Sequence, residues 1–198
     1  MDNIPLIYDK TGSPLIGIKK MKLFVHVLPV TKVQFEKFIA EVNLPDFSDE
    51  WYENILKLNS RVSYKKFTEE NYWKLFITGI YPEEAMKFAE YLGNDYRLPD
   101  VDEWREIYRY FKYSSLHFKV KGKPGILKRL EKFIGNDLFS LTLMEKGIAE
   151  WVKEGRKYVG VGKPDSNFQQ SALKPLYDKI DPVGERLSYV GFRLVKDM

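Results

Sequence analysis

The spacing of apolar residues predicts most of the helices in this chain. Within 31–42, apolar residues recur at i, i+3, i+4 and i+7, which is typical of a helix that buries one face. A short helix is expected near 51–58, inside an aromatic and irregular stretch. Further helices with one apolar face are predicted over 82–92, 101–111 and within 123–135.

Residues at the ends of these segments support the helix boundaries. Thr31 with Gln34, and Asp100 with Glu103, have the spacing of capping boxes, in which each side chain bonds the other residue's backbone N–H. Gly93 follows the helix predicted over 82–92 and is expected to end it in the left-handed αL conformation.

Strands are predicted at both ends of the chain. Two short strands are expected around a turn at Asp9–Ser13, and a further strand over 22–30 contains His26. Because no repeat or linker is visible, residues 1–198 are expected to form a single α+β domain. In the last third, short apolar segments predict strands over 148–152, 157–162 and 189–195.

Composition limits the chemistry that is available. The 198 residues include no cysteine, which excludes disulfides, thiolate metal sites and a cysteine nucleophile. The formal net charge is +4, and the basic stretch 117–133 is interpreted as a surface hairpin followed by an amphipathic helix. No motif that reads RNA or DNA accompanies it, so a nucleic-acid partner is not expected. A Lys- and Glu-rich chain without cysteine is also typical of heat-adapted proteins.

The start of the chain predicts its location. The first twelve residues have neither a basic region nor an apolar run, and no stretch approaches the ~18 apolar residues of a membrane span. We therefore expect a cytoplasmic or virion-associated protein without a membrane partner.

Four motifs occur in a recognisable order. They are VTKVQFEKF at 30–38, IYPEEAMKFAEYLGNDYRLPDVDEW at 80–104, GIAEWV at 147–152 and VGFRLV at 190–195. Together they resemble the motif order of the formylglycine-generating-enzyme family, or sulfatase-modifying-factor domain, from about Phe24 onward. The resemblance implies a C-type lectin-like fold, in which a few helices surround small twisted antiparallel sheets and much of the chain is loop.

The resemblance also implies structural roles for the strongest motif residues. In a loop-rich fold, side chains must satisfy many backbone polar groups. Arginines suit this task because each has five donors, and glutamates are suitable partners for them. The residues interpreted as scaffold are Arg97, Glu103, Trp104, Glu150, Trp151 and Arg193.

Departures from the family pattern remove its known chemistry. Formylglycine-generating members bind copper through cysteines, and this chain has none, so that activity is excluded. Relatives with an iron site use three histidines, whereas only His26 and His117 are present. Lys146 and Gly147 replace the Gly-Asn pair near a calcium site of some members, so calcium is not expected. We therefore predict no catalytic residues, no metal and no cofactor.

These arguments favour a non-catalytic binding module. Retroelement variable proteins of the same family carry diversified positions just before a terminal Gly-Phe-Arg. This chain has a polar and aromatic stretch there, residues 162–189, which we call the C-terminal window. We expect a protein or other macromolecule as partner, and a homo-oligomer stays open. The alternatives are an accessory or structural protein, such as a virion or maturation component, and a metal-dependent enzyme of unrecognised chemistry. The expected ligand-binding residues are Lys163, Asp165, Asn167, Phe168, Gln169, Tyr177, Asp178, Arg186 and Tyr189.

Overall fold

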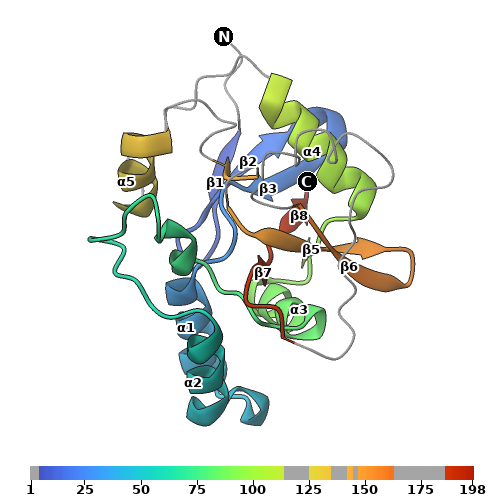
Figure 1. The fold of residues 1–198 in the computed structure, drawn as a ribbon. Helices are drawn as coiled ribbons and strands as arrows, with labels where there is room; N and C mark the ends of the chain where they lie inside the picture. Colours follow the sequence, from blue (N-terminus) through green and yellow to red (C-terminus); the bar gives the residue numbers. More distant parts are fainter. Residues whose placement is uncertain (1–4, 114–124, 135–141, 145–146, 163–185) are drawn as a thin grey trace.

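The computed structural model confirms the α+β class (Figure 1). It describes residues 5–113, 125–134, 142–144, 147–162 and 186–198. The helices within these ranges are α1 (Lys32–Val42), α2 (Asp49–Leu58), α3 (Pro82–Leu92), α4 (Val101–Tyr113) and α5 (Gly125–Ile134), with 3₁₀ turns η1 (Lys19–Met21), η2 (Pro45–Phe47) and η3 (Tyr72–Leu75). The strands are β1 (Leu6–Tyr8), β2 (Pro14–Ile18), β3 (Leu23–His26), β4 (Tyr96–Arg97), β5 (Ala149–Glu154), β6 (Lys157–Val161), β7 (Val190–Gly191) and β8 (Val195–Asp197).

The larger sheet joins residues from distant parts of the chain. Its strand order is β1-β2-β3-β8-β4, and every neighbouring pair is antiparallel. The β1–β2 hairpin turns at the predicted Asp9–Ser13 position, and β2 pairs with β3 so that Leu15 lies opposite His26. The strand β8 comes late in the chain but lies between β3 and β4, with Val195 opposite both Val25 and Arg97.

The smaller sheet has the order β6-β5-β7. The β5–β6 hairpin is antiparallel, whereas β5 and β7 run parallel with Glu150 opposite Gly191. A parallel bridge between Asp100 and Lys153 connects the start of α4 to this sheet. The strands predicted over 148–152 and 157–162 are therefore confirmed as β5 and β6, whereas the predicted strand over 189–195 is divided between β7 in this sheet and β8 in the larger one.

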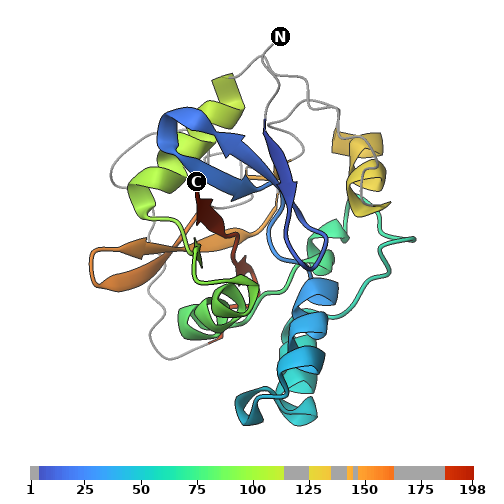
Figure 2. The ribbon, with the colours of Figure 1, turned by 180° about the vertical axis from the view of Figure 1, so that it is seen from behind.

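Two groups of buried side chains form the core. In one, Trp104 and Tyr108 of α4 pack with β2 and β3 residues such as Ile16 and Val25. In the other, α1, α2 and α3 pack their aromatic faces together, and Phe35 stacks on Phe88 with ring centres 5.6 Å apart. Figure 2 shows α1 and α2 side by side from the opposite direction.

The five predicted helices are all present, and the structure corrects one boundary detail. Gly93 follows α3 with φ of 151° and ψ of 162°, so the predicted αL conformation is wrong. Glycine is still favoured there, because side chains rarely adopt so positive a φ. The helix predicted at the end of the basic stretch is confirmed as α5, whereas the hairpin predicted before it lies outside the described residues.

Candidate ligand-binding pocket

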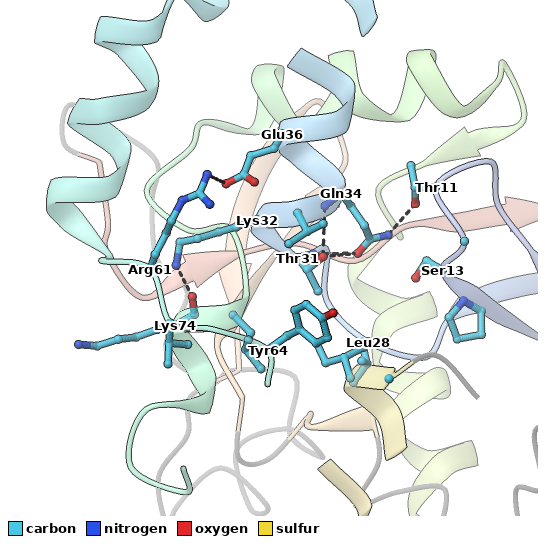
Figure 3. Close-up of a pocket in the computed structure, with 17 residues that line it drawn as sticks. Thr11, Ser13, Leu28, Thr31, Lys32, Gln34, Glu36, Arg61, Tyr64 and Lys74 are labelled. Carbon is cyan, nitrogen blue, oxygen red and sulfur yellow. Dashed lines mark hydrogen bonds and ion pairs between the residues drawn. The ribbon is translucent and has the colours of Figure 1, made fainter. Parts of the chain in front are cut away.

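A cavity of about 350 Å³ opens beside the first turn of α1, and we call it the α1 pocket. Its walls come from the β1–β2 turn, the start of α1, residues 61–64, η3 and the start of α5 (Figure 3). Apolar side chains make up much of the wall, and polar groups from α1 and the β1–β2 turn approach from one side. The apolar lining residues include Leu28, Val62, Leu75 and Ile126.

A buried carboxylate shapes the β1–β2 turn at the edge of the pocket. Asp9 Oδ2 lies 2.9 Å from His26 Nε2, and both side chains are fully buried. Asp9 Oδ1 accepts hydrogen bonds from Thr11 N–H at 2.8 Å, Thr11 Oγ1 at 2.6 Å and Ser13 N–H at 3.0 Å. Burial alone would raise the pKa of Asp9, but the hydrogen bonds and the charge of His26 lower it overall. This network fixes Thr11 and Ser13 at the pocket wall.

The predicted capping box at the start of α1 is confirmed and extends to this turn. Thr31 N–H donates to Gln34 Oε1 at 2.9 Å, and Gln34 N–H donates to Thr31 Oγ1 at 3.3 Å. Gln34 Nε2 then donates to Thr11 Oγ1 at 2.9 Å. Helix and hairpin are thus joined by side chains that line the pocket.

Lys32 places a buried amine at the pocket wall. The residue is 4% exposed, and its Nζ donates to the carbonyl oxygens of Lys74 and, at 3.4 Å, Ser60. Burial is the main cause that lowers the pKa of Lys32 to about 7; the nearby charges of Arg61 and Lys74 act in the same direction, and the charge of Glu36 opposes them. Across the described ranges, no carboxylate forms an ion pair with this amine.

The nearest carboxylate is already engaged by other groups. Glu36 accepts a hydrogen bond from the Tyr52 hydroxyl and pairs with the Arg61 guanidinium (Figure 3). Burial and Glu36 together raise the pKa of Tyr52, so its hydroxyl keeps its proton. The Lys74 amine lies 5.6 Å from the centre of the Trp73 ring, and its side chain extends away from the α1 capping box.

Arg97, predicted to be structural, forms a two-pronged ion pair at the start of α4. Its NH1 and NH2 groups donate to Glu103 Oε2 and Oε1 at 2.7 and 2.8 Å, and NH2 also reaches Asp197 at 3.0 Å. Glu103 additionally accepts from the Asp100 backbone N–H at 2.8 Å. Burial alone would raise the pKa of Glu103, but Arg97 and this backbone bond lower it overall. The pair therefore connects the α4 cap to β4 and β8.

Arg193 occupies a fully buried position among several chain segments. It donates to both oxygens of Glu150, from Nε at 2.8 Å and from NH2 at 2.7 Å. It also donates to the carbonyl oxygens of His26 and Val27, each at 3.2 Å, and Thr142 at 2.6 Å. One guanidinium thus satisfies backbone groups from widely separated segments.

The two tryptophans beside the glutamate motifs also donate inside the core. Trp104 Nε1 donates to Glu150 Oε2 at 3.0 Å, and Trp151 Nε1 donates to the Ile80 carbonyl oxygen at 2.9 Å. Trp104 and Trp151 are 1% and 2% exposed, so neither indole lies on a binding surface.

Most of the predicted ligand surface lies outside the described residues. This applies to Lys163, Asp165, Asn167, Phe168, Gln169, Tyr177 and Asp178. Arg186 is described and pairs with both oxygens of Glu84, at 2.7 and 2.8 Å, and donates to Gly79 O at 2.9 Å. Tyr189 is 43% exposed. The structure does not bring these two residues to the α1 pocket.

Neither a metal cluster nor a membrane span is found in the parts of the chain that the structure covers. Over those residues, no three His, Cys, Asp or Glu side chains gather as metal ligands, and His117 lies outside them. No helix within the same ranges is long and apolar enough to cross a bilayer. Comparison of the chain with protein-family models finds no match, and comparison with curated proteins finds none either.

Sequence reasoning missed Lys32, although a signal for it was present. Lys32 lies three residues before Phe35 and seven before Ile39, so it falls on the same face of the helix as the apolar stripe. A lysine on a buried face requires an explanation, because charged side chains are rarely fully buried without a partner.

Proposed function

We propose that this protein is a non-catalytic ligand-binding module on a C-type lectin-like scaffold, and that a small organic molecule occupies the α1 pocket. The cavity volume of about 350 Å³ carries the proposal. Small-molecule sites are usually concave, mostly apolar and equipped with a few converging polar groups. The α1 pocket has this composition, with Leu28 and Leu75 among its walls and Thr31 and Gln34 on its polar side.

Rigid support around the pocket favours binding. Its polar side is fixed by the Asp9 network and the capping box of α1, which are joined through Gln34 and Thr11. Side chains held by such networks lose little conformational entropy when a ligand arrives. The pocket is therefore suited to recognise a ligand without rearranging.

Ligand-observed NMR tests the proposal with small matched probes. Benzoate, phenylacetate and hexanoate, together with their neutral amides, are screened for saturation transfer from the intact protein. We expect at least one acid–amide pair to give a signal. Val62→Trp places an indole at the partly buried pocket wall and should abolish that signal.

Tyr113→Trp is the matched control, because Tyr113 is 68% exposed at the end of α4 and is not a lining residue. It should leave the signal unchanged. Absence of a signal from every probe, or an equal signal from Val62→Trp, would contradict binding in the pocket.

A macromolecular ligand at the C-terminal window is the second candidate function. Arg186, at the window's far end, is fixed to α3 through Glu84, and its guanidinium lies 4.3 Å from the centre of the Tyr81 ring. Such anchoring supports the presentation of a recognition loop on a fixed scaffold.

Replacing Phe168, Tyr177 and Tyr189 together by Ala should remove a partner captured by pull-down without changing the melting temperature. Loss of folding in that variant would contradict the assignment.

A further inference from the structure

The charges around the α1 pocket leave one cation without a counter-ion. Arg61 is paired with Glu36, and the Lys74 amine is directed toward Trp73. Lys32 contacts only neutral acceptors in the described structure, namely two backbone carbonyl oxygens. Buried charges in proteins are normally paired, so the ammonium form of Lys32 would be stabilised by an anion that binds beside it.

We propose that the α1 pocket selects molecules that carry a single carboxylate on an apolar body, with the carboxylate paired to Lys32. This inference rests on the proposed function and specifies the chemical class of its ligand. A charge-assisted bond between ammonium and carboxylate supplies the missing counter-ion. The apolar side chains Leu28, Val62 and Ile126 provide the surface for the ligand's body. The N-terminal end of α1 adds a favourable dipole for an anion.

The charge count favours a singly charged head group over a phosphate. Three described cations line the pocket. Arg61 is paired with Glu36 and the Lys74 amine lies near the Trp73 ring, so Lys32 is left to bind an anionic ligand. A dianionic phosphate would bring a second negative charge near Glu36, whose ion pair in the described structure is with Arg61. Comparing the affinities of a carboxylate and a phosphonate that carry the same apolar group therefore shows which head group the pocket prefers.

Binding of a carboxylate also predicts a proton linkage. The titratable or charged groups facing Lys32 are Glu36 from its own helix, Arg61 and Tyr64 from the segment after α2, and Lys74 from η3. The wall residues from β2 and α5 are Pro14, Gly125 and Ile126, which do not titrate. Free Lys32 has its pKa lowered to about 7, so a bound carboxylate that favours the ammonium must draw a proton from solvent above that pH.

Isothermal titration calorimetry of the intact protein tests this with phenylacetate, phenylacetamide and benzylphosphonate. At pH 6 we expect phenylacetate to bind at least about tenfold more tightly than the neutral amide. At pH 8, two buffers of different ionisation enthalpy should report uptake of most of one proton per bound phenylacetate, and almost none at pH 6. Affinity should fall by about tenfold per pH unit once Lys32 is largely neutral. Benzylphosphonate should bind no more tightly than phenylacetate.

Each alternative result has a defined meaning. Equal affinity for acid and amide, or absence of proton uptake at pH 8, overturns the carboxylate inference and leaves the pocket as a binding site. Tighter binding of benzylphosphonate overturns the choice of head group. If none of the three probes binds and none of the NMR probes does, the proposed function fails as well.

Variants provide an independent test. Lys32→Met should remove the preference for the acid while retaining binding of the amide. Lys37→Met, on the same helix with its side chain 45% exposed, should preserve both the preference and the proton uptake. If Lys32→Met does not fold, the pH dependence of phenylacetate affinity and the buffer-dependent proton uptake of the wild-type protein still test whether Lys32 pairs with the carboxylate. A Lys32→Met protein that folds and keeps the acid preference would contradict the inference.

Discussion

Two bidentate ion pairs differ in how strongly water screens them. Arg193 and Glu150 are 0% and 1% exposed, whereas the side chains of Arg97 and Glu103 are 32% and 24% exposed. Both pairs use two parallel N–H···O bonds. Removing one partner of a buried pair leaves an uncompensated charge, which is far more costly than breaking a pair that water can reach.

We therefore expect Glu150→Gln to lower the free energy of unfolding by about 3–5 kcal/mol. The matched variant Glu103→Gln should lower it by less than about 1 kcal/mol. Urea denaturation followed by tryptophan fluorescence measures both values. Similar losses in the two variants would show that burial does not govern the contribution of these pairs.

The lowered pKa of Asp9 predicts that the free energy of unfolding decreases in acid. Its pKa is lowered in the folded protein from the usual value of 3.8, so the unfolded chain binds a proton more readily. The carboxylate's contribution is fully present above about pH 4 and is lost as pH falls through the lower folded pKa. Asp9→Asn should destabilise the protein at pH 7, and the stability gap from wild type should narrow below pH 4. Urea titrations between pH 3 and 7 measure the gap, and a constant gap would contradict this linkage.

At the residue scale, the sequence indicates bonding partners better than it indicates cavities. The motif arginines were expected to bond glutamates or backbone carbonyls as scaffold, and the structure pairs Arg97 with Glu103. Lys32 is different, because its neighbours Arg61 and Lys74 lie 29 and 42 positions away in the chain. No local pattern shows that these segments converge on one pocket.

At the level of elements, helices were predictable because their periodicity and caps are local. The buried face of α4 contains the five apolar residues that its spacing predicts. Short strands were expected as segments, but their neighbours could not be derived from the chain. The pairing of β8 between β3 and β4 depends on contacts across the whole sequence, which no local spacing encodes.

Close packing explains the glycine at the end of β7. A Cβ at Gly191 would overlap the backbone carbonyl oxygen of Ile77 and the side chain of Ile148. Backbone atoms cannot move aside cheaply, so Gly191→Ala should lower stability by about 1–3 kcal/mol. Gly125→Ala is the control, because its nearest neighbour would be a Tyr64 ring carbon at 3.8 Å, and alanine favours the helix. In thermal unfolding, the melting temperature of Gly191→Ala should be lower than that of wild type, and that of Gly125→Ala should be equal to or higher than that of wild type. Any other order would contradict this packing.

Across the whole molecule, late segments of the chain complete structures begun by early ones. Arg193 bonds the carbonyl oxygens of His26 and Val27 as well as Glu150, and β8 lies in the interior of a sheet that starts with β1. Such long-range closure favours one cooperative unit, as the single-domain prediction proposes. It also means that the core cannot be complete until the residues after β7 are in place.

Ending the chain after Leu194 tests this dependence directly. The change removes β8 but retains Arg193, so it separates the strand's contribution from that of the buried ion pair. Val195 is fully buried, and its loss together with the hydrogen bonds to β3 and β4 exposes the centre of the sheet. We expect urea unfolding to lose its cooperative transition. A control ending after Asp197 removes only Met198, which is 52% exposed, and should unfold like wild type. A cooperative transition in the Leu194 variant with an unchanged midpoint would show that the sheet does not need its interior strand.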